Sequence, residues 1–205
     1  MIEIPQFWPF ALTCLLIELT PGPNMAYLAI LTTSEGRRAG FSAVAGVALG
    51  LLLVGLSAAV GLATLISESP LWYEVLRWAG VFYLLWLSWE GWRVNAETSP
   101  GKAGATVRAR YFYRGLITNL LNPKAAIFYI AILPGFLNTS AALAPQGILL
   151  TCIYVSIATA IHSLIVFLAH ASRRFFESRN QLYVRRALSL LLALVALWFG
   201  WKTAR

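Results

Sequence analysis

Long apolar segments alternate with short polar ones along most of the chain. Uncharged runs such as 39–67 and 147–169 exceed the roughly 18 to 20 apolar residues that a helix needs to cross a bilayer. The pattern predicts six membrane-spanning helices, at residues 7–33, 40–66, 71–93, 114–137, 145–170 and 182–202. We therefore expect an all-α integral membrane protein whose helices pack as one bundle.

The composition favours the same class. Of the 205 residues, 59% are hydrophobic and 12% are charged, whereas a soluble globular chain is about 25% charged. The net charge of +8 comes from basic residues between the hydrophobic segments, so we expect membrane lipid and not nucleic acid as a partner. Cys14 and Cys152 lie in apolar segments, which predicts neither a disulfide framework nor a cysteine metal site.

The basic residues are divided unequally between the two sides of the predicted bundle. Loops one, three and five, with their flanks, hold twelve: Arg37, Arg38, Arg93, Lys102, Arg108, Arg110, Arg114, Arg173, Arg174, Arg179, Arg185 and Arg186. The N-terminal stub and loops two and four hold none, and the C-terminus adds Lys202 and Arg205. Because basic loops stay in the cytoplasm, we expect a multi-pass protein of the cytoplasmic (inner) membrane with both termini outside.

Two of the predicted spans are interrupted by proline motifs. The first span contains Thr-Pro-Gly-Pro-Asn at 20–24, and the fourth contains Asn-Leu-Leu-Asn-Pro-Lys at 119–124. Proline removes a helix hydrogen bond and frees a carbonyl group, which a membrane tolerates only inside protein or beside a wet cavity. The alternative is that these prolines only kink their helices for packing.

The two interruptions divide the chain into similar halves. Pro21 and Pro123 are 102 residues apart. We expect a first three-helix half at 1–93, a cytoplasmic connecting loop at 94–113 and a second half at 114–205. Because three spans are an odd number, the halves would be inverted repeats. Broken helices at matching positions of inverted halves indicate a transporter's binding site.

The motifs resemble those of the LysE/RhtB family of amino-acid exporters. The first-half signature of the family is matched by residues 20–24 and 36–40, with Gly46 and Gly50. Residues 76–87 are similar to the family's third-helix pattern. The second-half signature is matched by Arg114-Gly115, Asn119 and residues 122–124. The resemblance implies a six-helix exporter of an amino acid or close derivative, coupled to an ion gradient, often of protons, and we expect alternating access. The chain departs from the family at Glu18, usually a small or apolar residue, and at Ser88, often glycine.

The residues at the two breaks suit an amino-acid zwitterion. Lys124 is a cation deep in a predicted span, where an unpaired charge is costly and therefore indicates function. Backbone N–H groups freed near Pro21, Pro23 and Pro123 can add partial positive charge toward a carboxylate. The side chains of Asn24, Asn119 and Asn122 can both donate and accept hydrogen bonds. These seven residues form the predicted substrate site, and the alternative roles are a buried ion pair for Lys124 and helix-to-helix bonds for the asparagines.

Two further residues are candidates for proton coupling. Glu18 is a deep carboxyl group that could carry a proton, bind the substrate's ammonium group or balance Lys124. His162 is an imidazole in the fifth span, suited by its chemistry to a proton relay, although a neutral histidine bonded between helices is the alternative.

Ser42, Gly46 and Gly50 recur every four residues along the second span. Small residues at this spacing predict close helix packing, and a homodimer through the stripe is the alternative.

Other functional classes have less support in the sequence. It contains neither a His-Glu-x-x-His nor a Gly-x-Ser-x-Gly motif, so we expect no enzyme, no catalytic residues and no cofactor. An exporter of metal ions or another small solute is the main alternative, but deep carboxylates are few and we expect no resident metal. A channel or a membrane scaffold remains a further alternative.

Overall fold

The chain folds into helices throughout the part that the computed structural model describes, namely residues 4–20, 22–59, 70–93, 105–138, 141–176 and 181–202. The α-helices are α1 (Ile4–Leu19), α2 (Pro23–Glu35), α3 (Arg37–Ala59), α5 (Pro70–Arg93), α6 (Ala105–Leu120), α7 (Pro123–Ile127), α8 (Leu143–Phe176) and α9 (Gln181–Lys202). A π-helical turn, Phe128–Ile132, and a 3-10 turn, Leu133–Phe136, follow α7. The predicted all-α class is therefore confirmed.

Several of these helices can cross a membrane. Arg37–Ala59 and Leu143–Ser172 are long and apolar enough by themselves, and Phe7–Leu19 with Pro23–Glu35 qualifies as one span bent by 56°. Trp78–Trp89 and Arg186–Trp198 are shorter apolar stretches. Large apolar side chains on the outer faces, such as Trp8 (70% exposed) and Leu194 (62% exposed), are suited to lipid contact. The count of six spans stays a prediction.

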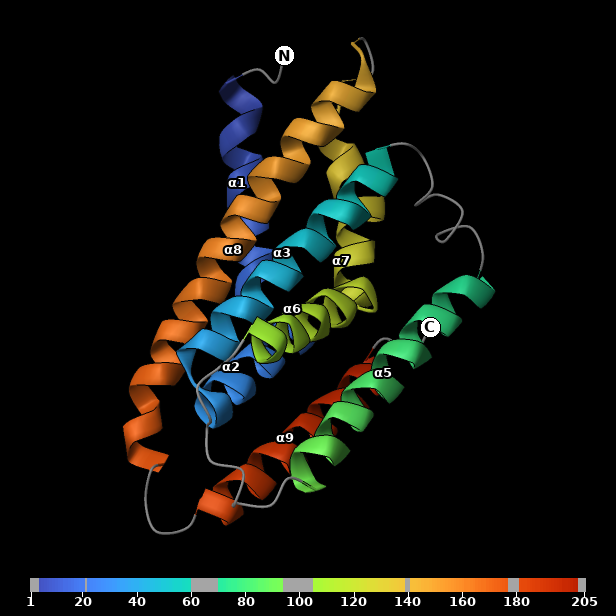
Figure 1. Cartoon of the computed structure of the whole chain (residues 1–205). Coiled ribbons are helices and arrows are strands. Elements are labelled where there is room, and N and C mark those ends of the chain that lie inside the picture. The colour runs from blue at the N-terminus through green and yellow to red at the C-terminus, as the bar shows by residue number, and fades with distance from the viewer. Residues whose placement is uncertain are drawn as a thin grey trace.

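The helices form two groups that meet at α2. Figure 1 shows α5 and α9 side by side, while α3 lies between α6 and α8 in the other group. Helix α2 packs against α3 and α8, and it also contacts α9. Helix α2, the second part of the broken segment, therefore lies between the two groups, whereas α1 packs against α8.

Glycine residues permit a tight turn before α3 and a close contact between α3 and α6. Gly36 is the single residue between α2 and α3, and its φ of 88° lies in the left-handed region that glycine adopts at little cost. A Cβ atom on Gly46 would overlap the carbonyl oxygen of Phe112, and one on Gly115 would overlap that of Ala43. Gly46 and Gly50, from the predicted stripe of small residues on α3, thus pack closely against α6 of the same chain. Helix α6 covers Gly46 and Gly50 within the chain, and a homodimer stays a prediction.

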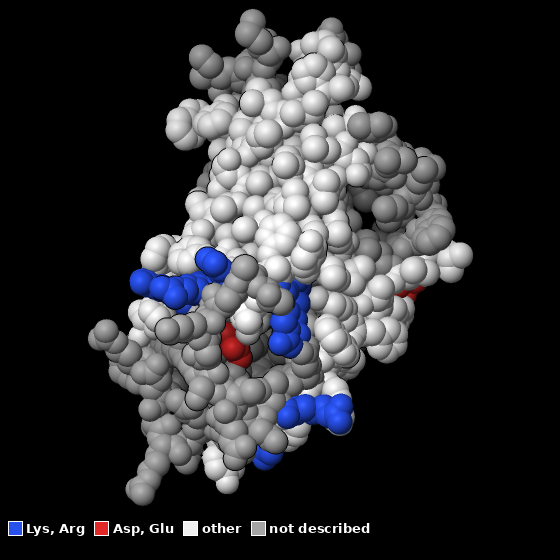
Figure 2. Space-filling model, in the orientation of Figure 1, with Lys and Arg blue, Asp and Glu red and all other residues white. Residues whose placement is uncertain are grey.

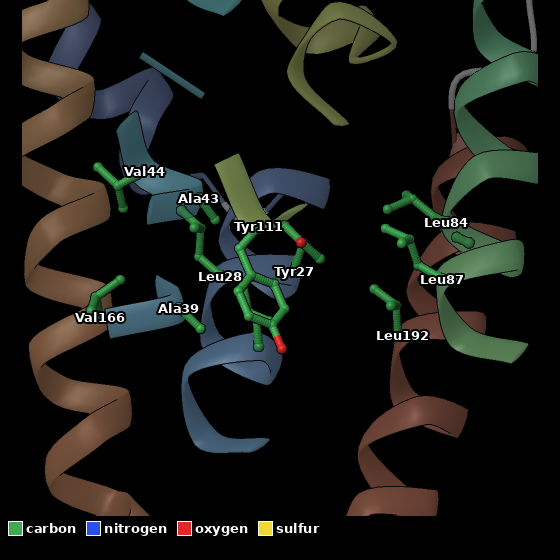
Figure 3. Packing of buried hydrophobic residues seen from close by; sticks show 12 residues of the cluster. Tyr27, Leu28, Ala39, Ala43, Val44, Leu84, Leu87, Tyr111, Val166 and Leu192 are labelled. Atoms are coloured by element: carbon green, nitrogen blue, oxygen red, sulfur yellow. The ribbon is translucent and has the colours of Figure 1, made fainter. Parts of the chain in front are cut away.

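An apolar contact joins the two groups. Tyr27 and Leu28 of α2 and Tyr111 of α6 lie across from Leu84 and Leu87 of α5 and Leu192 of α9 (Figure 3). All of these side chains are buried. Burial of apolar surface is the main stabilising contribution to this junction.

The fourth predicted span differs from a simple helix. Helix α6 begins at Ala105, inside the predicted connecting loop 94–113, because residues 105–113 contain no proline or glycine and Tyr111 is anchored by a 3.0 Å hydrogen bond to Glu35 Oε2. Beyond α7 the chain forms π and 3-10 turns, consistent with Pro134, which cannot donate a backbone hydrogen bond. Residues 94–104 lie outside the described part of the chain.

Candidate functional site

Both predicted helix breaks are present, and they are built in the same way. Helix α2 has Gly22 as its N-cap and Pro23 in its first turn, and α7 has Asn122 as its N-cap with Pro123 in its first turn. Proline suits this position because the first turn of a helix has no intrahelical acceptor for its N–H groups. Pro23 is therefore the structural counterpart of Pro123. Comparison of the two halves of the sequence instead matches Pro123 with Pro21. Pro21 lies outside the described residues, and so does the side chain of Pro123.

The two breaks contact each other reciprocally. Asn24, just after the first break, donates from Nδ2 to Oδ1 of Asn119, just before the second, at 2.8 Å. Lys124, just after the second break, donates from Nζ to the backbone oxygen of Thr20, just before the first, at 2.8 Å. The ammonium group of Lys124 thus binds a carbonyl group that the interruption of α1 leaves free of a helical partner.

Local geometry holds the positively charged side chain in place. The side chain of Asn122 accepts a hydrogen bond from the backbone N–H of Lys124 at 3.0 Å, which caps α7. A Cβ atom on Gly22 would lie 3.3 Å from Cδ of Lys124, so only a residue without a side chain leaves the lysine its full room. Gly22 thus belongs to the candidate site, whereas the sequence analysis considered it only as part of the break.

The two predicted proton-coupling residues also lie together. Glu18 of α1 is 4% exposed and His162 of α8 is 1% exposed, and Oε2 of the glutamate is 3.4 Å from Nε2 of the histidine. Tyr154 of α8 donates from its hydroxyl group to Oε1 of Glu18 at 2.6 Å. The buried carboxyl group therefore has a polar neighbour at each oxygen.

Tyr154 is a member of the site that the sequence analysis missed. It lies eight residues before His162 on α8, or about two helical turns away. This spacing was the available signal. A tyrosine in an apolar span is, however, equally typical of packing, and the stacked ring contact between Tyr154 and Phe128 shows that it also packs.

A small cavity joins the breaks and the buried cluster. Its lining consists of Glu18, Gly22, Asn24, Met25, Leu51, Asn122, Lys124, Ala125, Tyr154 and His162. The anionic and cationic groups of Glu18 and Lys124 thus face one space and interact electrostatically. The cavity measures about 10 Å³, about enough for one water molecule. The bundle is therefore closed around this site.

The remaining predicted residues take supporting places. Asn119 does not line the cavity; it is fully buried, it holds Asn24, and it packs against Gly50. Pro23 is buried behind the N-terminus of α2. Asn24 Oδ1 has no hydrogen-bond partner among the described residues, which leaves a buried acceptor at the edge of the cavity. Across the same residues, no group of three or more His, Cys, Asp or Glu side chains is placed to hold a metal ion.

The chain is similar in sequence to known proteins. Residues 15–205 match the family model described as LysE type translocator. The chain is 36% identical over 123 residues to a homoserine/homoserine lactone efflux protein of Salmonella typhimurium. The aligned region covers 58% of this chain and 60% of the relative. It is also 32% identical over 127 residues to a leucine efflux protein of Salmonella choleraesuis. That aligned region covers 60% of this chain and 58% of the relative. The chain thus matches about 60% of the length of these relatives. No solved structure matches.

Proposed function

The chain belongs to the LysE type translocators, and we propose that it exports an amino acid or a close derivative across the membrane. Members of this family are transporters and not enzymes, as the sequence analysis predicts. The similar proteins from Salmonella are named for the efflux of homoserine, homoserine lactone or leucine, which supports a substrate of this class.

The observation that carries the proposal is that Glu18 and Lys124, which have opposite charges, both line the closed cavity. An amino acid is a zwitterion, so its carboxylate needs a donor and its ammonium group needs an acceptor. Lys124 and the first N–H groups of α2 supply donors, while Glu18, Asn24 Oδ1 and the backbone oxygen of Thr20 supply acceptors. The site thus has a partner for each charged end of the substrate.

We propose that the two halves are inverted repeats, an arrangement that would bring the two breaks face to face. In such a fold the second helix of each half packs against the broken helix of the other half. Helix α3 lies against α6, and α8 lies against α1 and α2, while the contacts α3–α8 and α5–α9 each join corresponding helices. The reciprocal bonds Asn24–Asn119 and Lys124–Thr20 follow the same two-fold relation. This pairing supports two inverted halves of three spans, at 1–93 and 114–205.

Transport requires the closed site to open. A cavity of about 10 Å³ cannot contain an amino acid. Binding therefore has to separate the contacts between the breaks, and release on the other side has to separate them again. Opening toward one side at a time is alternating access. The half-helices α2 and α7 are the natural moving parts, because each begins directly after a break, at the N-cap residues Gly22 and Asn122.

Coupling to a proton gradient rests on the buried cluster. Glu18, His162 and Tyr154 form a contiguous polar group beside Lys124. Protonation of Glu18 would remove the charge that faces the lysine and the substrate's ammonium group, and this would favour release of the substrate. The structure thus offers one group through which proton binding and substrate binding can compete.

The location follows from the distribution of basic side chains. Figure 2 shows the Lys and Arg residues of this face gathered toward one end of the described structure, and the other end of the view is free of them. We assign the basic end to the cytoplasm, which places both termini outside the cytoplasmic membrane. Reporter fusions after Gly104 and after Arg205 should therefore report opposite compartments. Matching compartments would contradict the six-span arrangement.

Release of amino acids by living cells tests the function. Bacteria that express the chain and are fed dipeptides should release one of the liberated amino acids faster than cells with an empty vector. A matched culture that expresses the Lys124→Ala variant controls for effects of expression. Equal release from all three cultures, over a panel of the common amino acids, would contradict the proposal.

A further inference from the structure

A second, apolar cavity lies beside the charged one. It is formed between α2, α8 and α9, is partly open to the outside, and measures about 290 Å³. One wall consists of the N-cap residue Gly22 with Met25, Ala26 and Ala29 of α2, and the opposite walls are Ile165 of α8 with Val195 and Trp198 of α9. Apart from the indole N–H of Trp198, the side chains of this lining carry no hydrogen-bonding group.

The two cavities are neighbours. Gly22 and Met25 line both of them, so they form the partition between the charged space and the apolar one. Gly22 has no side chain, which makes this partition thin beside the side chain of Lys124. A group held at Lys124 and Glu18 would thus lie one residue away from a large apolar space.

The sequence of α2 keeps this space open. Residues 22, 25, 26 and 29 follow the spacing of three and four that places residues on one face of a helix. This face carries small residues or methionine, while the bulky Tyr27 and Leu28 are buried in the apolar junction on another face. A helix with bulky residues on both faces would fill the cavity.

We infer that this cavity receives the side chain of the transported amino acid, and that the preferred substrates therefore have a large aliphatic or aromatic side chain. The inference rests on the proposed function, because it needs the zwitterion to be held at the charged cavity. Its size is suitable, since an enclosed apolar cavity of about 150 Å³ binds benzene, and this partly open one, of about 290 Å³, has room for an apolar side chain. A homoserine-sized polar side chain would leave most of it empty.

Selectivity of export tests the inference. Vesicles containing the purified full-length chain are preloaded with labelled leucine or alanine at low concentration, and the two release rates are compared. We expect the wild type to release leucine about tenfold faster or more, since loss of even one methylene group in an apolar pocket costs about tenfold. Ala29→Phe should fill the cavity and reduce the ratio of leucine to alanine release by about tenfold.

Two further variants make the result decisive. Ala29→Val adds two methyl groups, fills the cavity only in part, and should reduce the ratio by about threefold or more; it decides the question if the phenylalanine variant does not fold. Ala160→Phe places the same ring at an exposed position of α8 that lines neither cavity, and its ratio should equal that of the wild type.

The outcomes separate this inference from the proposed function. Release of alanine as fast as leucine by the wild type, or an unchanged ratio in both Ala29 variants, would overturn the inference alone. The cavity would then be a lipid site or an empty space. A wild type that releases no amino acid would overturn both.

Discussion

Replacement of Lys124 with alanine is expected to reduce amino-acid export by about tenfold or more. A hydrogen bond made by a charged group contributes about 1.5 to 3 kcal/mol, and each 1.4 kcal/mol corresponds to a factor of ten. Lys124 faces Glu18 across the cavity and binds the free backbone oxygen of Thr20, so alanine removes both the proposed carboxylate donor and a contact between the breaks. The measurement is efflux from vesicles at equal amounts of membrane protein.

Companion variants distinguish charge from geometry. Lys124→Arg keeps the charge, but the bulkier guanidinium group does not fit beside Gly22, so export should still be substantially impaired. Lys202→Ala removes a lysine from the last residue of α9 and should transport like the wild type. Normal export by Lys124→Ala would exclude a direct role for this residue.

Replacement of Glu18 with glutamine is expected to stop efflux that is driven by a pH gradient, while exchange of internal for external substrate continues. Glutamine keeps an oxygen that can accept from Tyr154, but it cannot gain or lose a proton. Exchange needs no net proton movement, so it should survive. Both modes are measured in the same vesicles, with and without an imposed gradient. Tyr154→Phe is the matched control, since it removes a neighbour of the carboxyl group and leaves the group able to bind a proton.

The other roles of Glu18 give different results. If it binds the substrate's ammonium group, glutamine should weaken efflux and exchange together. If it only balances Lys124, then Glu18→Gln should be defective in both folding and transport, and a second change of Lys124 to methionine should restore folding but not transport. Gradient-driven efflux that is unchanged in Glu18→Gln would remove all three roles.

Local features of the site could be predicted because local chemistry determines them. Gly22-Pro23 and Asn122-Pro123 each favour a helix start, since a cap residue followed by proline suits the first turn of a helix. The positions of both breaks could thus be read from the chain. The length and the uncharged character of 39–67 likewise indicated a membrane helix before any contact was known.

Contacts between distant residues could not be predicted in the same way. The bonds Asn24–Asn119 and Lys124–Thr20 join residues 95 and 104 positions apart. Glu18 and His162 were each candidates for chemical reasons, but only the packing of α1 on α8 brings them together. The start of α6 at Ala105 was missed because its basic residues look like a polar loop, whereas they form part of an amphipathic helix.

Release of amino acids from vesicles that contain only the purified chain tests the central claim most directly. Vesicles preloaded with each common amino acid in turn are diluted into buffer without it, and the internal label is followed over time. The account predicts that at least one amino acid leaves faster than from protein-free vesicles, and that the Lys124→Ala protein abolishes this difference. Release at the protein-free rate for every amino acid tested would contradict the account.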